Sequence, residues 1–181
     1  LFAYFGTVFL PLRSPNFFGG GLENYLEYPL LWGWANFDGE HYLAIAQNGY
    51  KALEHSFFPL YPILMRLFGG SSLPHLVWAG LAISNVFFLG SLFLFWKLLR
   101  LDYSERVSFF TLVLLLAFPT SFYFGAVYTE SAFLFFALLF FYLARRDFWW
   151  QGGIVGAFAS ATRIFGILLL HSPQLLQLKI R

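Results

Sequence analysis

The apolar positions of this chain fall into blocks that are long enough to cross a lipid bilayer. A membrane-spanning helix needs about 20 predominantly apolar residues. Residues 73–98 meet this requirement, and no charged residue lies between Leu76 and Trp96. The pattern therefore predicts a transmembrane helix over this segment.

A second apolar stretch, residues 107–144, is too long for one crossing and carries a single charge, Glu130. Pro119 and Gly125 interrupt it, and both residue types break regular helices. We therefore expect two helices joined by a tight hairpin. A further apolar block follows, with Arg163 inside it. The additional transmembrane helices are predicted over residues 106–120, 128–144 and 152–170.

The part of the chain before these helices contains no block of spanning length. Residues 1–12 are apolar but too short to cross, so we interpret them as the end of a first helix. The chain is accordingly expected to be the amino-terminal part of a longer protein. Residues 13–72 form a long loop with two helix-like stretches, 38–48 and 57–68. Both stretches are too short to span, and we expect them to lie along the membrane surface.

Composition supports an all-α, polytopic transmembrane protein that forms one domain over residues 1–181. Hydrophobic residues make up 59% of the chain and charged residues only 11%, whereas soluble domains carry about 25% charged residues. Aromatic residues, at 23%, suit lipid-facing surfaces and the membrane interface. The net charge of +2 is spread without a basic patch, which argues against nucleic acid as a partner. The absence of cysteine excludes disulfides and thiolate metal sites.

Positively charged residues predict how the helices are oriented. Lys97, Arg100 and Arg106 lie in one short connection, and Arg145 and Arg146 lie in another. Cytoplasmic loops are enriched in Lys and Arg, and both connections fall on the same side of the predicted spans. The long first loop and the hairpin then face outward. We expect an integral membrane protein of a prokaryotic plasma membrane, or of the endoplasmic reticulum in a eukaryote.

Ionisable side chains from three segments gather on the outward side of this topology. A charged residue inside a membrane costs about 2.5–3.5 kcal/mol, so its presence there indicates a function. Glu130 lies at the outer end of its helix, Arg163 lies past the middle of its span, and Asp38 opens the first helix-like stretch of the loop. Within that stretch, Asp38, His41 and Tyr42 follow helical spacing and share one face. We therefore expect a polar site at the outer face.

Each of these residues also has a purely structural alternative. Asp38 could serve only as a helix N-cap, and Glu130 could only complement a helix dipole. Arg163 could pair with Glu130 or extend towards the interface, although its depth favours a buried role. His41 is interpreted as a supporting residue, because Asp38, Glu40 and His41 do not form a specific metal-binding pattern. The sequence thus supports no dedicated metal site and leaves a divalent metal open.

Short motifs follow one another in a fixed order along most of the chain. They are N-F-D-G-E-H-Y-L-A-I-A-Q-N-G-Y at 36–50, F-F-P-L-Y-P at 57–62, S-N at 84–85, F-P-T-S at 118–121, Y-T-E-S at 128–131, and A-T-R at 161–163 with Gly166 after it. This order resembles the PIG-V family of mannosyltransferases and its prokaryotic relatives, whose first-loop pattern is roughly W-D-x-x-x-[YF]-x-x-I-A-x-x-G-Y. Phe37 stands where the family has Trp, and D-x-E-H is similar to more distant GT-C transferases. The sugar and the acceptor therefore stay open.

The resemblance implies a GT-C fold and a membrane glycosyltransferase. Such an enzyme moves a sugar, with mannose expected here, from a polyprenyl- or dolichyl-phosphate carrier to a lipid or glycan acceptor at the outer or luminal face, with inversion. Asp38 matches the Asp of the first-loop motif, and we expect it to act as general base. A phosphate leaving group needs cationic stabilisation, for which we expect Arg163. The other expected substrate-binding residues are Glu40, His41, Tyr42, Tyr128 and Glu130.

A membrane transporter or lipid flippase is the alternative function. Buried charges and broken helices also mark transport pathways. Transporters usually carry internal repeats and polar sites near the middle of the membrane, whereas this sequence shows no repeat and gathers its polar residues at one face. The pattern favours the enzyme. The expected partners are membrane lipid and the lipid-linked sugar. The sequence indicates no cofactor with certainty and leaves protein partners unknown.

Overall fold

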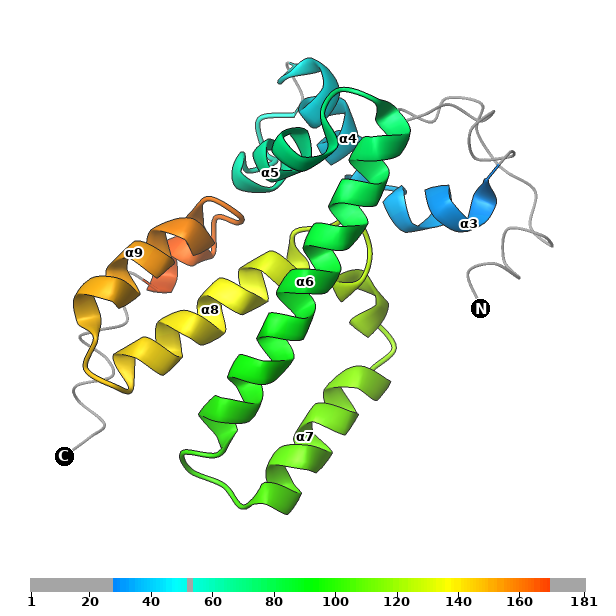
Figure 1. Cartoon of the computed structure of the whole chain (residues 1–181). Coiled ribbons are helices and arrows are strands. Elements are labelled where there is room, and N and C mark those ends of the chain that lie inside the picture. The colour runs from blue at the N-terminus through cyan, green and yellow to red at the C-terminus, as the bar shows by residue number, and fades with distance from the viewer. Residues whose placement is uncertain (1–27, 52–53, 170–181) are drawn as a thin grey trace.

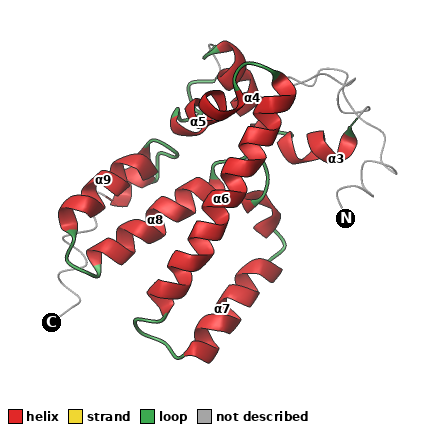
Figure 2. Ribbon diagram, in the orientation of Figure 1, coloured by secondary structure: helices red, strands yellow, loops and turns green. Residues whose placement is uncertain are grey.

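The computed structural model describes residues 28–51 and 54–169, and over these ranges the chain is folded into helices joined by short loops (Figure 1, Figure 2). No strand occurs in the described ranges. The segment predicted as the end of a first helix, residues 1–12, lies outside them. In chain order the helices are α3 (Pro29–Trp32), η1 (Gly33–Ala35), α4 (Asp38–Asn48), α5 (Leu60–Gly69), α6 (Leu73–Leu99), α7 (Glu105–Ala117), η2 (Ser121–Phe124), α8 (Glu130–Ala144) and α9 (Trp149–Ser160).

Helix α6 runs through the middle of the described chain, and the other helices are arranged around it (Figure 1). It coincides with the predicted segment 73–98 to within one residue. Its most apolar stretch has a mean hydropathy of 1.8, and only 33% of that stretch is buried inside the protein. Val86, Leu89 and Phe93 are among the exposed apolar side chains that remain. By length and composition, α6 is able to cross a membrane.

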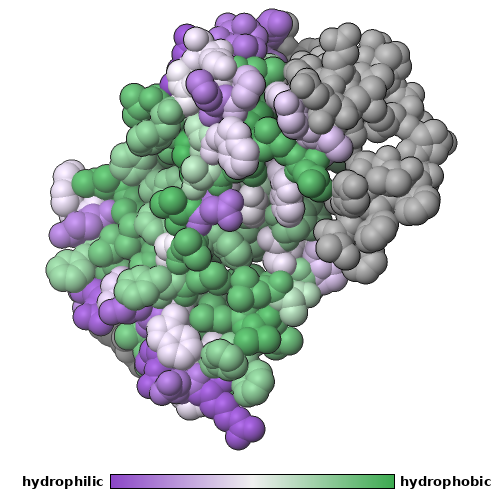
Figure 3. Space-filling view, turned by 45° about the vertical axis from the view of Figure 1, so that its right-hand side comes forward, coloured by the Kyte–Doolittle hydropathy of each residue, from purple (hydrophilic) through white to green (hydrophobic). Residues whose placement is uncertain are grey.

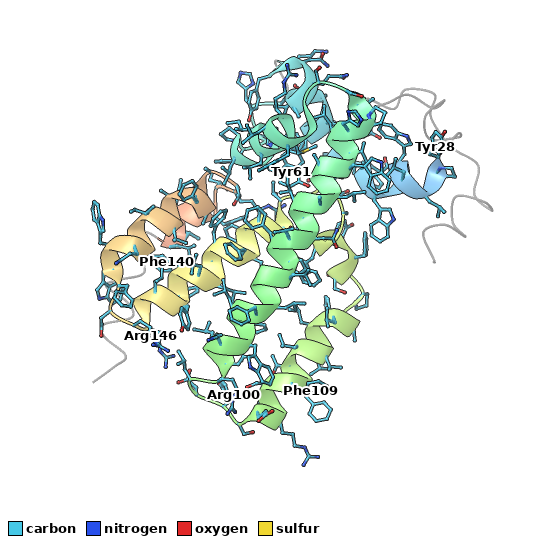
Figure 4. All side chains as sticks on the ribbon, in the orientation of Figure 1. Tyr28, Tyr61, Arg100, Phe109, Phe140 and Arg146 are labelled. Carbon is cyan, nitrogen blue, oxygen red and sulfur yellow. The ribbon has the colours of Figure 1, made fainter. Side chains whose placement is uncertain are left out.

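Small residues allow α8 to approach α6 closely. An added Cβ on Gly90 would lie 2.7 Å from a ring carbon of Phe135. The neighbouring Ser91 is buried and donates a hydrogen bond of 2.8 Å to the carbonyl one turn earlier in α6. Such contacts favour helix association in lipid, where apolar burial alone gives no preference for a second helix. On its other side, α8 packs against α9, with Phe140 buried between them (Figure 4).

Helices α7 and α8 are shorter than the predicted segments 106–120 and 128–144. Helix α7 ends at Ala117, because Phe118 precedes Pro119 and adopts an extended conformation with a ψ of 134°. Helix α8 begins two residues later than predicted. The two helices contain 13 and 15 residues, whereas a full crossing needs about 20. The polytopic arrangement therefore stays a prediction.

The structure corrects the predicted continuous helix over residues 152–170. Helix α9 ends at Ser160, and the chain turns before helical conformation resumes at Gly166. Gly166 lies directly against the end of α9, where a Cβ would overlap the backbone of Ser160. The chain can fold back at this point only because residue 166 has no side chain. Arg163 consequently lies in the turn and not inside a spanning helix.

Helices α4 and α5 lie over the end of α6 that begins at Leu73 (Figure 1). The bounds of α4 agree with the predicted stretch 38–48, whereas α5 begins three residues later and ends one residue later than the predicted stretch 57–68. The contact with α6 is a core that includes Leu43, Tyr61, Met65 and Val77, all fully buried. In this way α4 and α5 are packed onto one end of the bundle, which we call the α4 end. The placement of α4 and α5 along a membrane surface stays a prediction.

Candidate functional site

A hairpin between α7 and α8 holds the chain segment that leads into α4. The Val127 N–H donates to Trp34 O at 2.8 Å, and the Tyr128 hydroxyl donates to Asn36 O at 2.9 Å. On the opposite side of the hairpin, Ser84 Oγ of α6 donates to Tyr128 O at 3.2 Å. The start of α4 is therefore fixed by hydrogen bonds to a segment that lies about ninety positions further along the chain.

The residue before Asp38 adopts an unusual backbone conformation. Phe37 has a φ of 52° and a ψ of −117°, which costs about 1–3 kcal/mol in a residue with a side chain. Its N–H donates to Asn36 Oδ1 at 3.0 Å. Gly39 allows the close approach to the hairpin, because an added Cβ would lie 3.1 Å from Val127 O. The contacts of the hairpin thus maintain a strained segment next to the predicted base.

Asp38 occupies the first residue of α4, and Phe37 occupies the N-cap position. The alternative in which Asp38 serves only as N-cap is therefore incorrect. The Asp38 side chain is half-buried, and within the described residues its carboxylate accepts no hydrogen bond. It lies close enough to Tyr42, Tyr128 and Glu130 for electrostatic interaction with all three. A carboxylate that accepts no hydrogen bond keeps its lone pairs available to accept one from an incoming hydroxyl.

Tyr42 connects α4 to the start of α8. Its hydroxyl and Thr129 Oγ1 form a hydrogen bond of 3.3 Å, and both residues are buried. Burial raises the pKa of the Tyr42 hydroxyl to about 12, so the group stays neutral at any physiological pH. The hydroxyls of Tyr42 and Tyr128, both predicted to bind substrate, therefore form hydrogen bonds inside the protein. Their positions fit a role in holding the site together.

Glu130 and Arg163 form an ion pair, with Nη2 of Arg163 donating to Glu130 Oε1 at 2.8 Å. Their side chains are 23% and 35% exposed. The second carboxylate oxygen, Oε2, is buried and has no hydrogen-bond partner among the described residues. The turn that carries Arg163 is itself attached to α5, because Leu60 N–H donates to Ala161 O at 3.1 Å. The structure thus brings Asp38, Glu130 and Arg163 from three distant segments to the α4 end.

Glu40 and His41 complete the predicted set, and both are half-buried on α4. Glu40 is close enough to Tyr128 for electrostatic interaction. The His41 ring stacks on Phe57 with a centroid distance of 4.6 Å. Its Nδ1 lies 3.9 Å from Oε1 of Glu54. The binding roles assigned to Glu40 and His41 stay predictions.

Sequence reasoning missed three residues that contact the predicted site residues and hold them in position. Asn36, Glu54 and Thr129 were not singled out, although each contacts a predicted site residue. Asn36 and Thr129 stand inside the motifs that carry the family resemblance, so that signal was available. Glu54 lies in a short link, where spacing does not reveal which way a side chain points.

A groove of about 480 Å³ lies between α4 and α5, away from these residues. It is bordered by Tyr50, Pro59 and Arg66 among others, and none of the predicted site residues lines it. Arg66 donates to Ala46 O and Gln47 O, which closes the carboxyl end of α4. Its guanidinium is thus used in joining the two helices. Within the described ranges, no group of three or more His, Asp or Glu side chains is arranged to hold a metal ion.

The fold and the site define a class: a helical protein with an apolar helix able to cross a membrane, and with acids and an arginine gathered at one end. The chain matches the mannosyltransferase (PIG-V) family over residues 6–180, and it belongs to this family. This assigns it to the glycosyltransferases and confirms the predicted family. Comparisons with curated proteins and with solved structures gave no match.

Proposed function

We propose that this protein is an inverting GT-C glycosyltransferase. It transfers mannose from a polyprenyl- or dolichyl-phosphate carrier to a hydroxyl of a lipid or glycan acceptor. The observation that carries the proposal is the Asp38 carboxylate, which accepts no hydrogen bond from the described residues and lies near the Glu130–Arg163 ion pair at the α4 end. Membership of the mannosyltransferase family supports the choice of sugar.

Asp38 acts as the general base in this reaction. Its carboxylate takes the proton of the acceptor hydroxyl while the acceptor oxygen forms a bond to the anomeric carbon of mannose. The bond from that carbon to the phosphate oxygen breaks at the same time. Its electron pair leaves with the lipid phosphate, so inversion follows from attack on the opposite face. A single base is enough, because a phosphate needs no protonation to depart.

Arg163 stabilises the departing phosphate. A guanidinium presents several donors in one plane and matches phosphate oxygens well. Glu130 holds the guanidinium through Oε1, while its buried Oε2 is directed to a sugar hydroxyl. A buried acceptor without a donor costs about 1–3 kcal/mol, and a bound hydroxyl relieves that cost. Glu130 therefore contributes to binding and to the position of Arg163.

The proposed site lies where a lipid-linked donor arrives. Apolar residues cover most of the middle of one face, and hydrophilic residues gather towards its upper and lower ends (Figure 3). The exposed apolar side chains of α6 and α7 support contact with lipid tails along this middle band. We propose that the protein is a polytopic membrane protein with the α4 end at the outer or luminal face. A transporter would place its polar groups nearer the middle of the membrane.

The experiment is a transfer assay with the full chain in lipid nanodiscs. Polyprenyl-phosphate mannose, glucose and arabinose are offered as donors, and mannose transfer is expected. Asp38→Asn is expected to reduce the rate by about 10²- to 10⁴-fold, which is the usual contribution of a general base. Asp102→Asn, at the other end of the bundle, is the matched control and keeps the wild-type rate. Normal turnover by the Asp38 variant removes Asp38 from the role of base.

A further inference from the structure

The link between α4 and α5 is tightly hydrogen-bonded and directs one carboxylate inward. Lys51 N–H donates to Glu54 Oε2 at 2.9 Å, and Glu54 N–H donates to Lys51 O at 3.0 Å. Phe57 N–H donates to Glu54 O at 3.0 Å, and the Tyr50 hydroxyl donates to Phe57 O at 2.8 Å. These contacts fix both Glu54 and Phe57 against α4. The described part of the link is therefore held by hydrogen bonds within the link itself.

Glu54 is a buried acid that the proposed reaction does not use. Only 8% of the residue is exposed, although a buried carboxylate carries a desolvation cost of several kcal/mol. One oxygen accepts the Lys51 N–H described above. The other, Oε1, faces Nδ1 of His41 at 3.9 Å. Closing the link needs only the first oxygen, so the second contact calls for its own explanation.

His41 is held on two sides. Phe57 stacks on one face of the ring at 4.6 Å, and Glu54 lies at the Nδ1 edge. A third of the side chain, 33%, is still exposed. His41 follows Asp38 by three positions in α4, so the two side chains are neighbours on one face of the helix. These contacts hold the ring next to the proposed base.

The Glu54–His41 contact repeats the arrangement of the Glu130–Arg163 ion pair. In each, a largely buried carboxylate stands behind a cationic or potentially cationic side chain that is about one-third exposed. Arg163 is close enough to Tyr42, the neighbour of His41 in α4, for electrostatic interaction. An imidazole and a guanidinium that both lie near a carboxylate base can donate to a phosphate that departs from the reacting sugar.

We propose that Glu54 is a positioning residue that orients the His41 imidazole, so that His41 and Arg163 together bind the phosphate of the lipid-linked donor. The inference rests on the proposed function and extends it by a residue outside the family motifs. At 3.9 Å the Glu54 carboxylate acts on the imidazole through its charge and not through a hydrogen bond, and this charge favours the ring orientation in which Nδ1 faces it. Glu54 acts through His41 and does not touch the substrate.

The decisive variant is Glu54→Gln in the full chain. The amide oxygen still accepts the Lys51 N–H, so the link stays closed, while the charge facing His41 is lost. We expect the KM for polyprenyl-phosphate mannose to rise about three- to fivefold, as for a partly exposed ion pair, with kcat changed less than about twofold. Glu105→Gln, an exposed acid at the start of α7, is the matched control and leaves the donor KM unchanged.

Two further measurements separate positioning from a merely structural role. In a His41→Ala background, Glu54→Gln is expected to have no further effect on the donor KM, because its partner is gone. The ¹⁵N resonances of the His41 ring, assigned with a His41→Asn sample, are expected to shift in the Glu54→Gln protein even without substrate.

The failure of this inference differs from the failure of the proposed function. If the wild-type protein transfers no mannose, the proposed function fails, and the ring resonances still report on the contact. An unchanged donor KM in Glu54→Gln overturns the inference while transfer stands. The inference is also overturned if the ¹⁵N resonances of the His41 ring do not shift in the Glu54→Gln protein. It is overturned as well if Glu54→Gln changes the donor KM equally in the wild-type and His41→Ala backgrounds.

Discussion

In the described part of the chain, two arginine–carboxylate pairs lie at opposite ends of the helical bundle. At the α4 end, Arg163 contacts Glu130 through one hydrogen bond of 2.8 Å. At the other end, Arg145 binds Asp102 through two hydrogen bonds of 2.9 and 2.7 Å. The second pair has the better geometry, but it joins two exposed loops. The first is partly buried and keeps one carboxylate oxygen without a partner in the described chain.

The comparison teaches that environment, more than geometry, separates a structural ion pair from a candidate site. An exposed pair contributes little stability even when it is bidentate, because water competes for both partners. Arg145 and Asp102 tie the α6–α7 connection to the α8–α9 connection, and Arg100 and Arg146 lie at that same end (Figure 4). A partly buried pair with an unsatisfied oxygen costs more to maintain. Its position beside Asp38 gives a reason for that cost.

The largest difference is expected from removing each arginine. Arg163→Ala should raise the donor KM about tenfold or more, since a charged hydrogen bond contributes about 1.5–3 kcal/mol, and should change the acceptor KM much less. It should also lower the free energy of unfolding by about 1–2 kcal/mol, because Glu130 loses its partner in a half-exposed setting. Kinetics with both substrates varied, together with thermal unfolding in detergent, measure this. Arg145→Ala is the control, and an equal donor effect in both variants would break the comparison.

An intermediate effect is expected from the hydrogen bond that holds the segment before Asp38. Tyr128→Phe removes the donor to Asn36 O, a contact of about 1 kcal/mol, and releases the strained Phe37. We expect kcat to fall about fivefold with an unchanged donor KM, because Asp38 loses its position and the phosphate site does not. Tyr123→Phe, whose ring packs against Tyr128, is the control. A raised KM with normal kcat would instead assign Tyr128 to substrate binding.

The smallest effect is expected from Asp102→Asn. The hydrogen bonds from Arg145 hold the pKa of the Asp102 carboxyl below its usual range. The pair therefore stabilises the fold at pH values above about 4, and this contribution disappears as the pH falls through the lowered pKa. We expect a small decrease in melting temperature at pH 7 that vanishes in acid, with transfer activity unchanged. A difference that grows as the pH falls would contradict this account.

Much of the fold follows from local pattern. The stretches 38–48 and 73–98 coincide with α4 and α6 to within a residue, because periodicity and apolar length are read directly from neighbouring positions. The end of α7 was placed three residues too late, although Pro119 carried the signal. The break after Ser160 escaped prediction, since residues 161–165 contain neither proline nor glycine and are followed by more apolar residues. Only the packing of Gly166 against α9 shows the turn.

The residues of the candidate site also fall into two groups: those that the sequence reveals and those that only the structure reveals. Asp38, Glu130 and Arg163 stand out in the sequence, because a charge in an apolar chain is conspicuous and costly. The residues that hold Tyr42, Tyr128 and His41 do not stand out. Asn36 and Thr129 are ordinary polar residues, and Glu54 is an acid in a short link, where the sequence does not show that its side chain points inward.

By itself, the sequence determined that this is an apolar helical chain of the mannosyltransferase (PIG-V) family, with acids and an arginine in its expected outer segments. The tertiary structure decided how those groups meet. It set Arg163 in a turn beside Glu130, attached Tyr128 to Asn36, and directed Glu54 towards His41. The physical reason is range: helix formation depends on neighbours along the chain, whereas loop side chains are oriented by contacts between segments far apart in sequence.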